Sequence, residues 1–129
     1  MAEALLRDAL RGPEDISVKS AGLGALVGHP ASEFAIELMS ERGVDITSHR
    51  ARQIEPEMVK NADLILVMES GHKKAIDEND ATARGKVYRL GEWQDKEIDD
   101  PYRQEKTAFI EALDDIESGI ADWVERLKA

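Results

Sequence analysis

The residues best suited to chemistry stand together near the end of the chain, in the segment Asp99-Asp100-Pro101-Tyr102-Arg103. Carboxyl groups donate and accept protons in many enzymes, and a proline restricts its own backbone and that of the residue before it. Asp100, in front of Pro101, is therefore a candidate for an acid held in one orientation. An ordinary Asp-Pro turn before a helix explains the same residues equally well.

The chain contains no cysteine, which excludes disulfides and thiolate metal sites within its 129 residues. Its histidines, His29, His49 and His72, are scattered, so no metal site is expected. No serine has an adjacent base that would make it a nucleophile. The sequence thus contains a candidate acid and no candidate nucleophile.

The composition is typical of a globular protein, with 42% hydrophobic and 34% charged residues in a chain long enough for one domain. The net charge of -10 argues against nucleic-acid binding, which needs a concentrated basic surface. It does not exclude a phosphorylated substrate, because a local site can be positive on an acidic protein. The longest apolar run, Leu64–Met68, cannot span a membrane, and the N-terminus does not resemble a signal peptide. We therefore expect a cytoplasmic protein without membrane insertion.

Helix and strand patterns alternate along the chain, which predicts an α/β fold with a parallel sheet. Helices are predicted over residues 2–10, 32–42, 55–62, 70–78 and 105–127. Strands are predicted over residues 16–20, 63–68 and 86–91. We expect Gly12-Pro13 to end the first helix, Gly43 to end the second and Ser70 to cap the fourth. The pattern opens on a helix where such a sheet normally opens on a strand, so a first strand and turn are expected before Met1.

Four segments, taken in order, carry a resemblance to a known family. They are Met1–Leu6; Val18–Leu23 with Val27–Pro30; His49–Ile54 followed by Ala62–Met68; and Asp99–Arg103. Each is weak alone, but the ordered set covers essentially the whole chain and resembles the low-molecular-weight protein-tyrosine-phosphatases. The Gly-Leu-Gly-Ala-Leu-Val-Gly run and the Asp-Pro-Tyr-Arg segment look most like bacterial members tied to capsule and exopolysaccharide production.

The resemblance implies a three-layer α/β/α sandwich that hydrolyses phosphotyrosine through a phosphocysteine intermediate, without metal or cofactor. In the family, a Cys-x5-Arg-Ser-Pro loop directly precedes the helix that here begins at Ala2. Backbone amides, the arginine and the helix N-terminus hold the phosphate and favour the thiolate. Neither the cysteine nor the loop is present in this sequence. Arg7 and Arg11 lie at the wrong end of the helix to replace the arginine.

The resemblance also implies roles for residues that are present. Asp100 matches the general acid that protonates the tyrosyl oxygen, with Asp99 as the fallback candidate. Tyr102 matches an aromatic side chain at the pocket rim. Ser20 matches a serine that orients the phosphate loop, and His49 matches a histidine near the acid loop.

Structural explanations stay open for these residues. Tyr102 also fits a half-buried core tyrosine, and Ser20 also fits an ordinary serine at a strand end. For His49, a role in holding a loop through ring hydrogen bonds is the stronger interpretation. Arg103 and Glu69 are weaker candidates, because an exposed charge and a helix-capping carboxylate explain them as well.

On this resemblance, residues 1–129 form a single phosphatase-like domain that is shortened at its N-terminus and inactive by itself. In the family, the absent first strand lies between the strands that correspond here to Ile16–Ser20 and Leu64–Met68. Unpaired buried backbone groups cost about 1–3 kcal/mol each, so the monomer is expected to be marginally stable or prone to aggregate. Direct pairing of these two strands, or a strand from a partner, would relieve the cost and would allow oligomers.

The expected partner is a phosphotyrosine protein, such as an autophosphorylating tyrosine kinase. The alternative is a non-catalytic binding module that contacts a kinase or a partner strand. A receiver domain and a phosphate-loop nucleotide-binding domain are disfavoured, because the clustered acidic pocket and the glycine-lysine signature are missing. Arsenate reductases of the same fold need cysteines, which this chain lacks.

Overall fold

A computed structural model describes residues 1–11 and 16–127. The helices are α1 (Ala2–Ala9), α2 (Glu33–Glu41), α3 (Pro56–Asn61), α4 (Ser70–Asn79) and α5 (Lys106–Leu127), with short 3-10 helices η1 (Ala81–Ala83) and η2 (Glu92–Gln94). Strands β1 (Ile65–Val67) and β2 (Val87–Arg89) pair in parallel, with Leu66 opposite Tyr88. The predicted α/β class with a small parallel sheet is confirmed.

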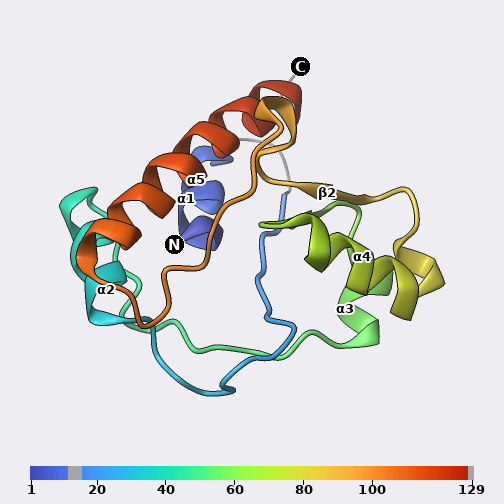
Figure 1. The fold of residues 1–129 in the computed structure, drawn as a ribbon, viewed down its shortest axis with the longest axis horizontal. Coiled ribbons are helices and arrows are strands. Elements are labelled where there is room, and N and C mark those ends of the chain that lie inside the picture. The colour runs from blue at the N-terminus through green and yellow to red at the C-terminus, as the bar shows by residue number, and fades with distance from the viewer. Residues whose placement is uncertain (12–15, 128–129) are drawn as a thin grey trace.

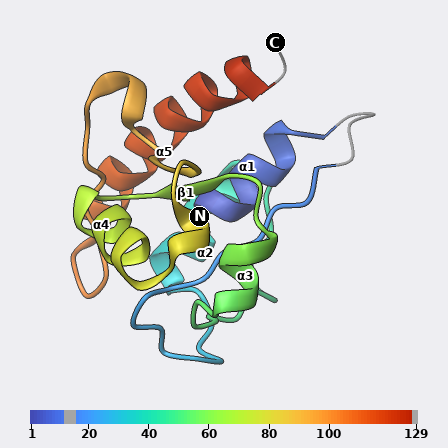
Figure 2. The ribbon, with the colours of Figure 1, turned by 90° about the vertical axis from the view of Figure 1, so that its right-hand side faces the viewer.

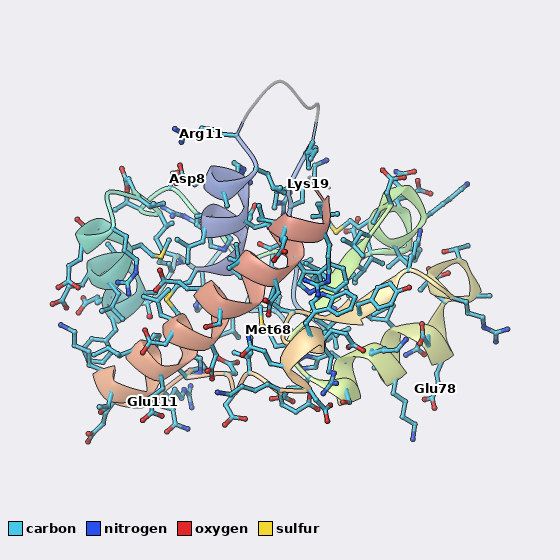
Figure 3. The ribbon with its side chains drawn as sticks, turned by 90° about the horizontal axis from the view of Figure 1, so that it is seen from above. Asp8, Arg11, Lys19, Met68, Glu78 and Glu111 are labelled. Carbon is cyan, nitrogen blue, oxygen red and sulfur yellow. The ribbon has the colours of Figure 1, made fainter. Side chains whose placement is uncertain are left out.

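Helices cover both faces of β1, as its continuous apolar sequence predicts, although only Val67 of the strand is fully buried. On one face Leu64, Leu66 and Met68 pack against residues of α1 and α5. On the other face Ile65 and Val67 pack with residues of α3 and α4. Figures 1 and 2 show the strands between the α1–α5 pair and the α3–α4 pair, which makes three layers. Figure 3 shows the acidic residues Glu78 and Glu111 at the periphery, while Met68, which is partly buried, lies near the centre of the view.

The long helix α5, predicted over residues 105–127, buries an apolar stripe along one side. Its buried residues include Phe109, Leu113, Ile116, Ile120 and Trp123. The N-terminal part of this stripe packs with α2 and the C-terminal part packs with α1 and β1, so α5 joins two of the three core clusters. None of the helices described in residues 1–11 and 16–127 is long and apolar enough to cross a membrane.

Local sequence signals account for both ends of α2. The Ser32 hydroxyl accepts a hydrogen bond from the Ala35 amide at 3.3 Å and so caps the N-terminus of the helix, a role for which serine is strongly favoured. Gly43 has a φ of 74°, a conformation that glycine adopts without strain, and it ends the helix as predicted. Phe34, in the first turn of α2, is 37% exposed and contacts Phe109 at a ring-centroid distance of 5.5 Å.

The predicted strand over Ile16–Ser20 is wrong. Direct pairing of this segment with Leu64–Met68, one of the two ways in which the missing strand could be replaced, does not occur in the described residues. The segment is described throughout, yet the sheet consists only of β1 and β2 in the described residues. Its polar groups contact α1 instead, where Arg7 donates a hydrogen bond to the Val18 carbonyl at 2.8 Å. A segment becomes a β-strand only where a neighbouring strand forms backbone hydrogen bonds with it. The alternation of apolar and polar residues within the segment does not show whether such a neighbour exists. Gly12-Pro13, the predicted end of the first helix, lies outside the described residues.

Ser70 does not cap α4. The residue at the N-cap position is Glu69, which makes no side-chain capping bond, and Ser70 is the first helical residue. The Ser70 amide instead donates to the Glu97 carboxylate at 2.8 Å. A distant acidic residue therefore satisfies one of the first helical N–H groups and also interacts favourably with the helix dipole.

Replacing Gly119 with alanine is expected to destabilise the protein. An added Cβ would lie 2.7 Å from the Leu90 carbonyl oxygen and 2.9 Å from the Leu90 Cγ, so α5 or the chain after β2 must move. Alanine favours the helix over glycine by about 1 kcal/mol. Overpacking of this kind costs about 1–3 kcal/mol, and here it also displaces the Leu90 carbonyl group. We therefore expect a net loss of stability in urea unfolding. Gly71→Ala in α4 is the matched control, because its Cβ would meet nothing within 4 Å and should stabilise. Equal effects at both positions would contradict the packing argument.

Candidate active site

Glu3, in the first turn of α1, is the centre of a polar cluster formed by distant segments. Its side chain is only 12% exposed. The Ser20 hydroxyl donates to Glu3 Oε2 at 2.6 Å, and His49 Nδ1 lies 3.4 Å from the same oxygen. Arg7 donates to Glu3 Oε1 at 2.7 Å, and Arg52 Nη2 lies 3.9 Å from that atom. The cluster joins α1 to the segment after it and to the segment before α3.

The carboxyl group of Glu3 stays ionised in this setting. Burial by itself raises its pKa, because a charged group loses hydration. The hydrogen bonds from Ser20 and Arg7, and the charges of Arg7 and His49, outweigh that cost and hold the pKa of Glu3 below its ordinary value. The negative charge of Glu3 at the start of α1 also interacts favourably with the helix dipole.

A short series of backbone hydrogen bonds between two loop segments positions His49 and Arg52. The glycine-rich loop, residues 22–30, runs beside residues 50–54. There the Gly28 amide donates to the Ala51 carbonyl and the Ala51 amide donates to the His29 carbonyl, each at 2.9 Å. Farther along, the Gly22 amide donates to the backbone carbonyl of Arg52 at 2.8 Å. Because backbone hydrogen bonds define the path of this segment, the side chains next to them reach Glu3 from fixed positions.

The Asp-Pro-Tyr-Arg segment forms a separate exposed turn before α5. Asp100 Oδ1 accepts a hydrogen bond from the Tyr102 amide at 3.0 Å, and the Gln104 amide donates to the Pro101 carbonyl at 2.8 Å. Tyr102 is 51% exposed, which does not fit a core tyrosine. Arg103 has a φ of 61° and its guanidinium lies 5.3 Å from the centre of the Tyr102 ring. The turn presents a carboxyl group and an aromatic ring to solvent.

The structure therefore places the predicted site residues in two groups. Ser20 and His49 meet on Glu3, and Asp100 and Tyr102 share one turn. Among the hydrogen bonds and ion pairs of the described residues, none joins one group to the other. Glu3 was missed by the sequence analysis, although its spacing of four residues from Arg7 is a signal for an ion pair on one helix face.

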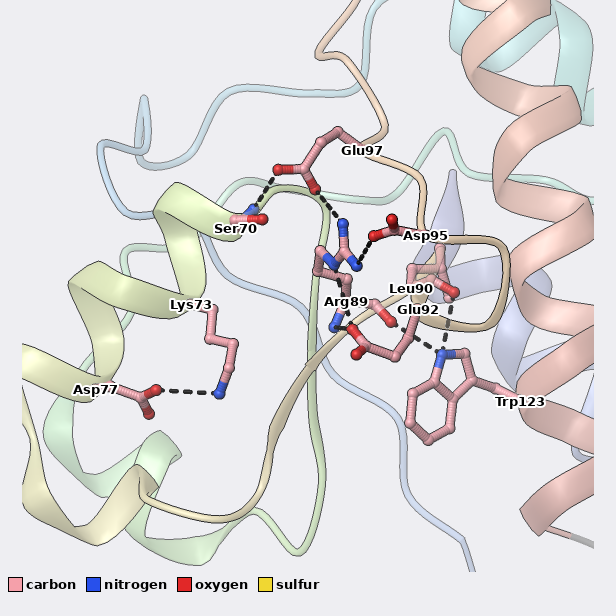
Figure 4. A network of polar contacts seen from close by, with 9 residues as sticks. All are labelled: Ser70, Lys73, Asp77, Arg89, Leu90, Glu92, Asp95, Glu97 and Trp123. Carbon is pink, nitrogen blue, oxygen red and sulfur yellow. Dashed lines mark hydrogen bonds and ion pairs between the residues drawn. The ribbon is translucent and has the colours of Figure 1, made fainter.

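A second polar network, also missed by the sequence analysis, lies at the carboxyl end of β2 (Figure 4). Arg89 is 15% exposed and contacts Glu92 at 3.2 Å, Asp95 at 2.7 Å and Glu97 at 3.2 Å. The hydrogen bonds to Asp95, Glu97 and Glu92 raise the pKa of Arg89 above its ordinary value. Since Glu97 also accepts from Ser70, the network ties β2 to the start of α4.

Glu69 and the remaining histidines take no part in these networks. Glu69 precedes α4 and lies 3.9 Å from His72, a contact at the limit of an ion pair. A groove of about 260 Å³ is lined by residues of α3, α4 and the glycine-rich loop, and none of the predicted site residues lines it. Across residues 1–11 and 16–127, no group of three or more histidine, aspartate or glutamate side chains could hold a metal ion.

Comparison with known proteins decides the family. The family model described as low molecular weight phosphotyrosine protein phosphatase matches residues 1–129. The chain belongs to this family. The probable low molecular weight protein-tyrosine-phosphatase EpsP of Ralstonia nicotianae is 48% identical over 129 residues, which are 100% of this chain and 87% of EpsP.

Solved structures of this phosphatase family share the fold. The tyrosine phosphatase Wzb from Escherichia coli K30, in complex with sulphate, gives a TM-score of 0.89 at 38% identity, over 98% of this chain and 87% of Wzb. The YwlE arginine phosphatase from Geobacillus stearothermophilus gives the same TM-score at 32% identity, over 98% of this chain and 82% of YwlE. Because one fold serves both phosphatases, the fold alone does not select the phosphorylated residue.

Proposed function

We propose that this low-molecular-weight phosphatase hydrolyses phosphotyrosine in proteins through a phosphocysteine intermediate, with Asp100 as the general acid. The observation that carries the proposal is the family match over the whole chain. Its relatives EpsP and Wzb are named as tyrosine phosphatases, which favours phosphotyrosine over phosphoarginine. The sequence contains no cysteine, so the nucleophile has to come from outside these 129 residues.

In the proposed reaction a thiolate attacks phosphorus, and the bond between phosphorus and the tyrosyl oxygen breaks. Tyrosine has a pKa of about 10, so its oxygen is a poor leaving group unless a proton arrives as the bond breaks. Asp100 supplies this proton and then accepts one from the water that attacks phosphorus and releases the thiolate. One Asp100 oxygen already accepts the Tyr102 amide, which orients the carboxyl group.

The other predicted residues have supporting roles in this proposal. Tyr102, half exposed beside Asp100, would stack on the substrate ring. Ser20 and His49 would orient the phosphate loop through Glu3, which binds both of them at the first turn of α1. Met1, at the N-cap of α1, makes no side-chain capping bond, so N–H groups at this helix end suit an anion.

The proposed partners are phosphotyrosine proteins, including autophosphorylating tyrosine kinases of bacterial capsule and exopolysaccharide production. The likeness of the glycine-rich run and the Asp-Pro-Tyr-Arg segment to that branch supports this proposal. The expected cytoplasmic location is consistent with such a partner and stays a prediction.

The 129-residue chain alone is expected to show no hydrolysis of p-nitrophenyl phosphate or of a phosphotyrosine peptide, because it has no thiol.

The decisive test reads the coding DNA directly before the Met1 codon, in frame. If it encodes a strand followed by Cys-x5-Arg-Ser-Pro, the extended chain should hydrolyse both substrates, and phosphoarginine much more slowly. Hydrolysis by the 129-residue chain itself would contradict the proposed nucleophile.

A stop codon or unrelated sequence before Met1 would favour the second candidate, a non-catalytic binding module. One observation supports this candidate. In the described residues β2 is the only strand that pairs with β1, and it occupies one edge of that strand. The other edge, which includes the backbone of Leu66, is then a site where an extended segment of a partner could add a strand.

A further inference from the structure

Both tryptophans of the chain lie where the C-terminal half of α5 meets β2. The ring of Trp123 is 5.6 Å, centre to centre, from the rings of Tyr88 and Trp93. Trp123 is buried, whereas Tyr88 is 40% exposed and Trp93 is 49% exposed. These residues, Tyr88, Trp93 and Trp123, form an aromatic cluster that presents two large rings to solvent, a composition typical of binding surfaces.

Trp123, the buried member of the aromatic cluster, is held in place before any ligand arrives. Trp123 Nε1 donates hydrogen bonds to the carbonyls of Arg89 at 3.1 Å and Leu90 at 3.0 Å (Figure 4). The Arg89 side chain is in turn bound by carboxylates of the η2 region. A ligand that stacks on preorganised rings loses little free energy to ordering of the protein.

The cluster already binds one guanidinium group from its own chain. Arg126 Cζ lies 3.6 Å from the centre of the Trp93 ring, in cation–π geometry. Arg126 also donates to the Asp122 carbonyl at 2.9 Å, so it is anchored to α5. Trp93 is half exposed with Arg126 in place, which leaves aromatic surface available for a second cation.

The charges around the cluster favour a cationic ligand. Glu92, Asp95 and Glu97 surround Arg89, and the side chain of Asp95 is 91% exposed although it contacts that arginine. Asp122 accepts a hydrogen bond from Gln94 at 2.8 Å, which places another carboxylate beside η2. Carboxylates therefore outnumber the guanidinium groups of Arg89 and Arg126 here.

We propose that the aromatic cluster binds an arginine-bearing basic segment of a partner protein. The partner's guanidinium stacks on the exposed ring of Tyr88 or Trp93 and pairs with the neighbouring carboxylates. Arginine fits better than lysine, because its planar group both stacks and forms paired hydrogen bonds with carboxylates. The proposal does not depend on the phosphatase chemistry, since no residue of the cluster has a proposed catalytic role.

Tryptophan fluorescence reports on this surface directly, because the chain has no tryptophan elsewhere. The 129-residue chain is titrated with hexaarginine, hexalysine and hexaglutamate at a physiological salt concentration, which screens long-range attraction. We expect hexaarginine to change the emission and to bind about tenfold more tightly than hexalysine. Hexaglutamate is expected not to bind.

Variants separate stacking from general attraction to an acidic protein. Trp93→Ala, followed by calorimetry, should weaken hexaarginine binding about tenfold. Asp95→Asn should also weaken it, and asparagine tolerates the φ of 48° at this position. Ile110→Ala is the control, because Ile110 is a 39% exposed apolar residue in the N-terminal half of α5. Circular dichroism melting curves show whether each variant is folded.

Several results would overturn the proposal. One is equal affinity for hexaarginine and hexalysine, and another is unchanged binding by folded Trp93→Ala. Absence of hexaarginine binding would also overturn it. If sedimentation shows self-association that Trp93→Ala abolishes, the occupant of the cluster is a second copy of this chain and the proposal is wrong.

Discussion

Replacing Asp100 by asparagine should lower kcat for a phosphotyrosine peptide by about 10²–10⁴-fold, the usual contribution of a general acid. The assay uses a form of the protein that carries the family's catalytic cysteine. Asparagine keeps the size of the side chain and can still accept the Tyr102 amide, so the turn before α5 should persist. The decrease in kcat is then caused by the loss of the proton donor and not by a change in the structure of the turn.

The leaving group makes this prediction specific. p-Nitrophenolate is a much weaker base than tyrosinate and needs less help from a proton, so its hydrolysis should fall less than that of phosphotyrosine. Asp99→Asn is the matched control, because Asp99 is also exposed and directly precedes Asp100. A larger loss for Asp99→Asn would assign the acid to Asp99, and equal losses for both substrates would point to a role in positioning.

Replacing Glu3 by alanine should cost about 3 kcal/mol of unfolding free energy, measured by chemical denaturation. The Glu3 side chain is 12% exposed and binds Ser20 at 2.6 Å and Arg7 at 2.7 Å. A hydrogen bond to a charged group contributes about 1.5–3 kcal/mol, and Arg7, itself 55% exposed, is expected to contribute less than Ser20. Without Glu3, the segment that contains Ser20 also loses a contact with α1.

Two variants make this measurement specific. Glu3→Gln keeps the side-chain volume and loses the charge, so its destabilisation should fall between wild type and Glu3→Ala. Glu33→Ala tests a glutamate in the first turn of α2 that is exposed, and it should change stability by no more than about 0.5 kcal/mol. If Glu33→Ala were as costly as Glu3→Ala, the loss would reflect the helix dipole and not the cluster.

The Glu3 contribution should also depend on pH. Since the pKa of Glu3 in the folded protein is lowered, the unfolded chain binds the proton more readily. The stabilisation is therefore fully present above the ordinary glutamate pKa of about 4.3 and is lost as pH falls through the lower folded value. The stability difference between wild type and Glu3→Gln should shrink steadily below about pH 4. A difference that stays constant down to pH 2 would contradict an ionised Glu3.

Helix α2 and helix α5 show how far local sequence reaches. The cap of α2 at Ser32, its end at Gly43 and the apolar stripe of α5 all depend on residues within a few turns of each other. Such interactions form wherever the local sequence favours them. The strand β1 was also predictable, because a short continuous apolar run is typical of a strand that has helices packed on both of its faces.

The segment Ile16–Ser20 and the start of α4 show where local sequence fails. Alternation predicted a strand over Ile16–Ser20, but strand formation depends on a neighbour that accepts its hydrogen bonds, and these residues contact α1 instead. Ser70 had the right residue type for a cap, yet Glu97 binds its amide from a distance of 27 residues in sequence. Neither partner could be chosen from the residues next to the segment.

The sequence by itself determined the family, the α/β class and the Asp100–Tyr102 turn, because ordered motifs, apolar periodicity and a proline act within short segments. Only the tertiary structure decided which distant groups meet. Glu3, Ser20 and His49 come from separate segments, and so do Trp93 and Trp123. Their meeting depends on how α1 and α5 pack on the small sheet, since no spacing along the chain encodes the distance between side chains that packing brings together.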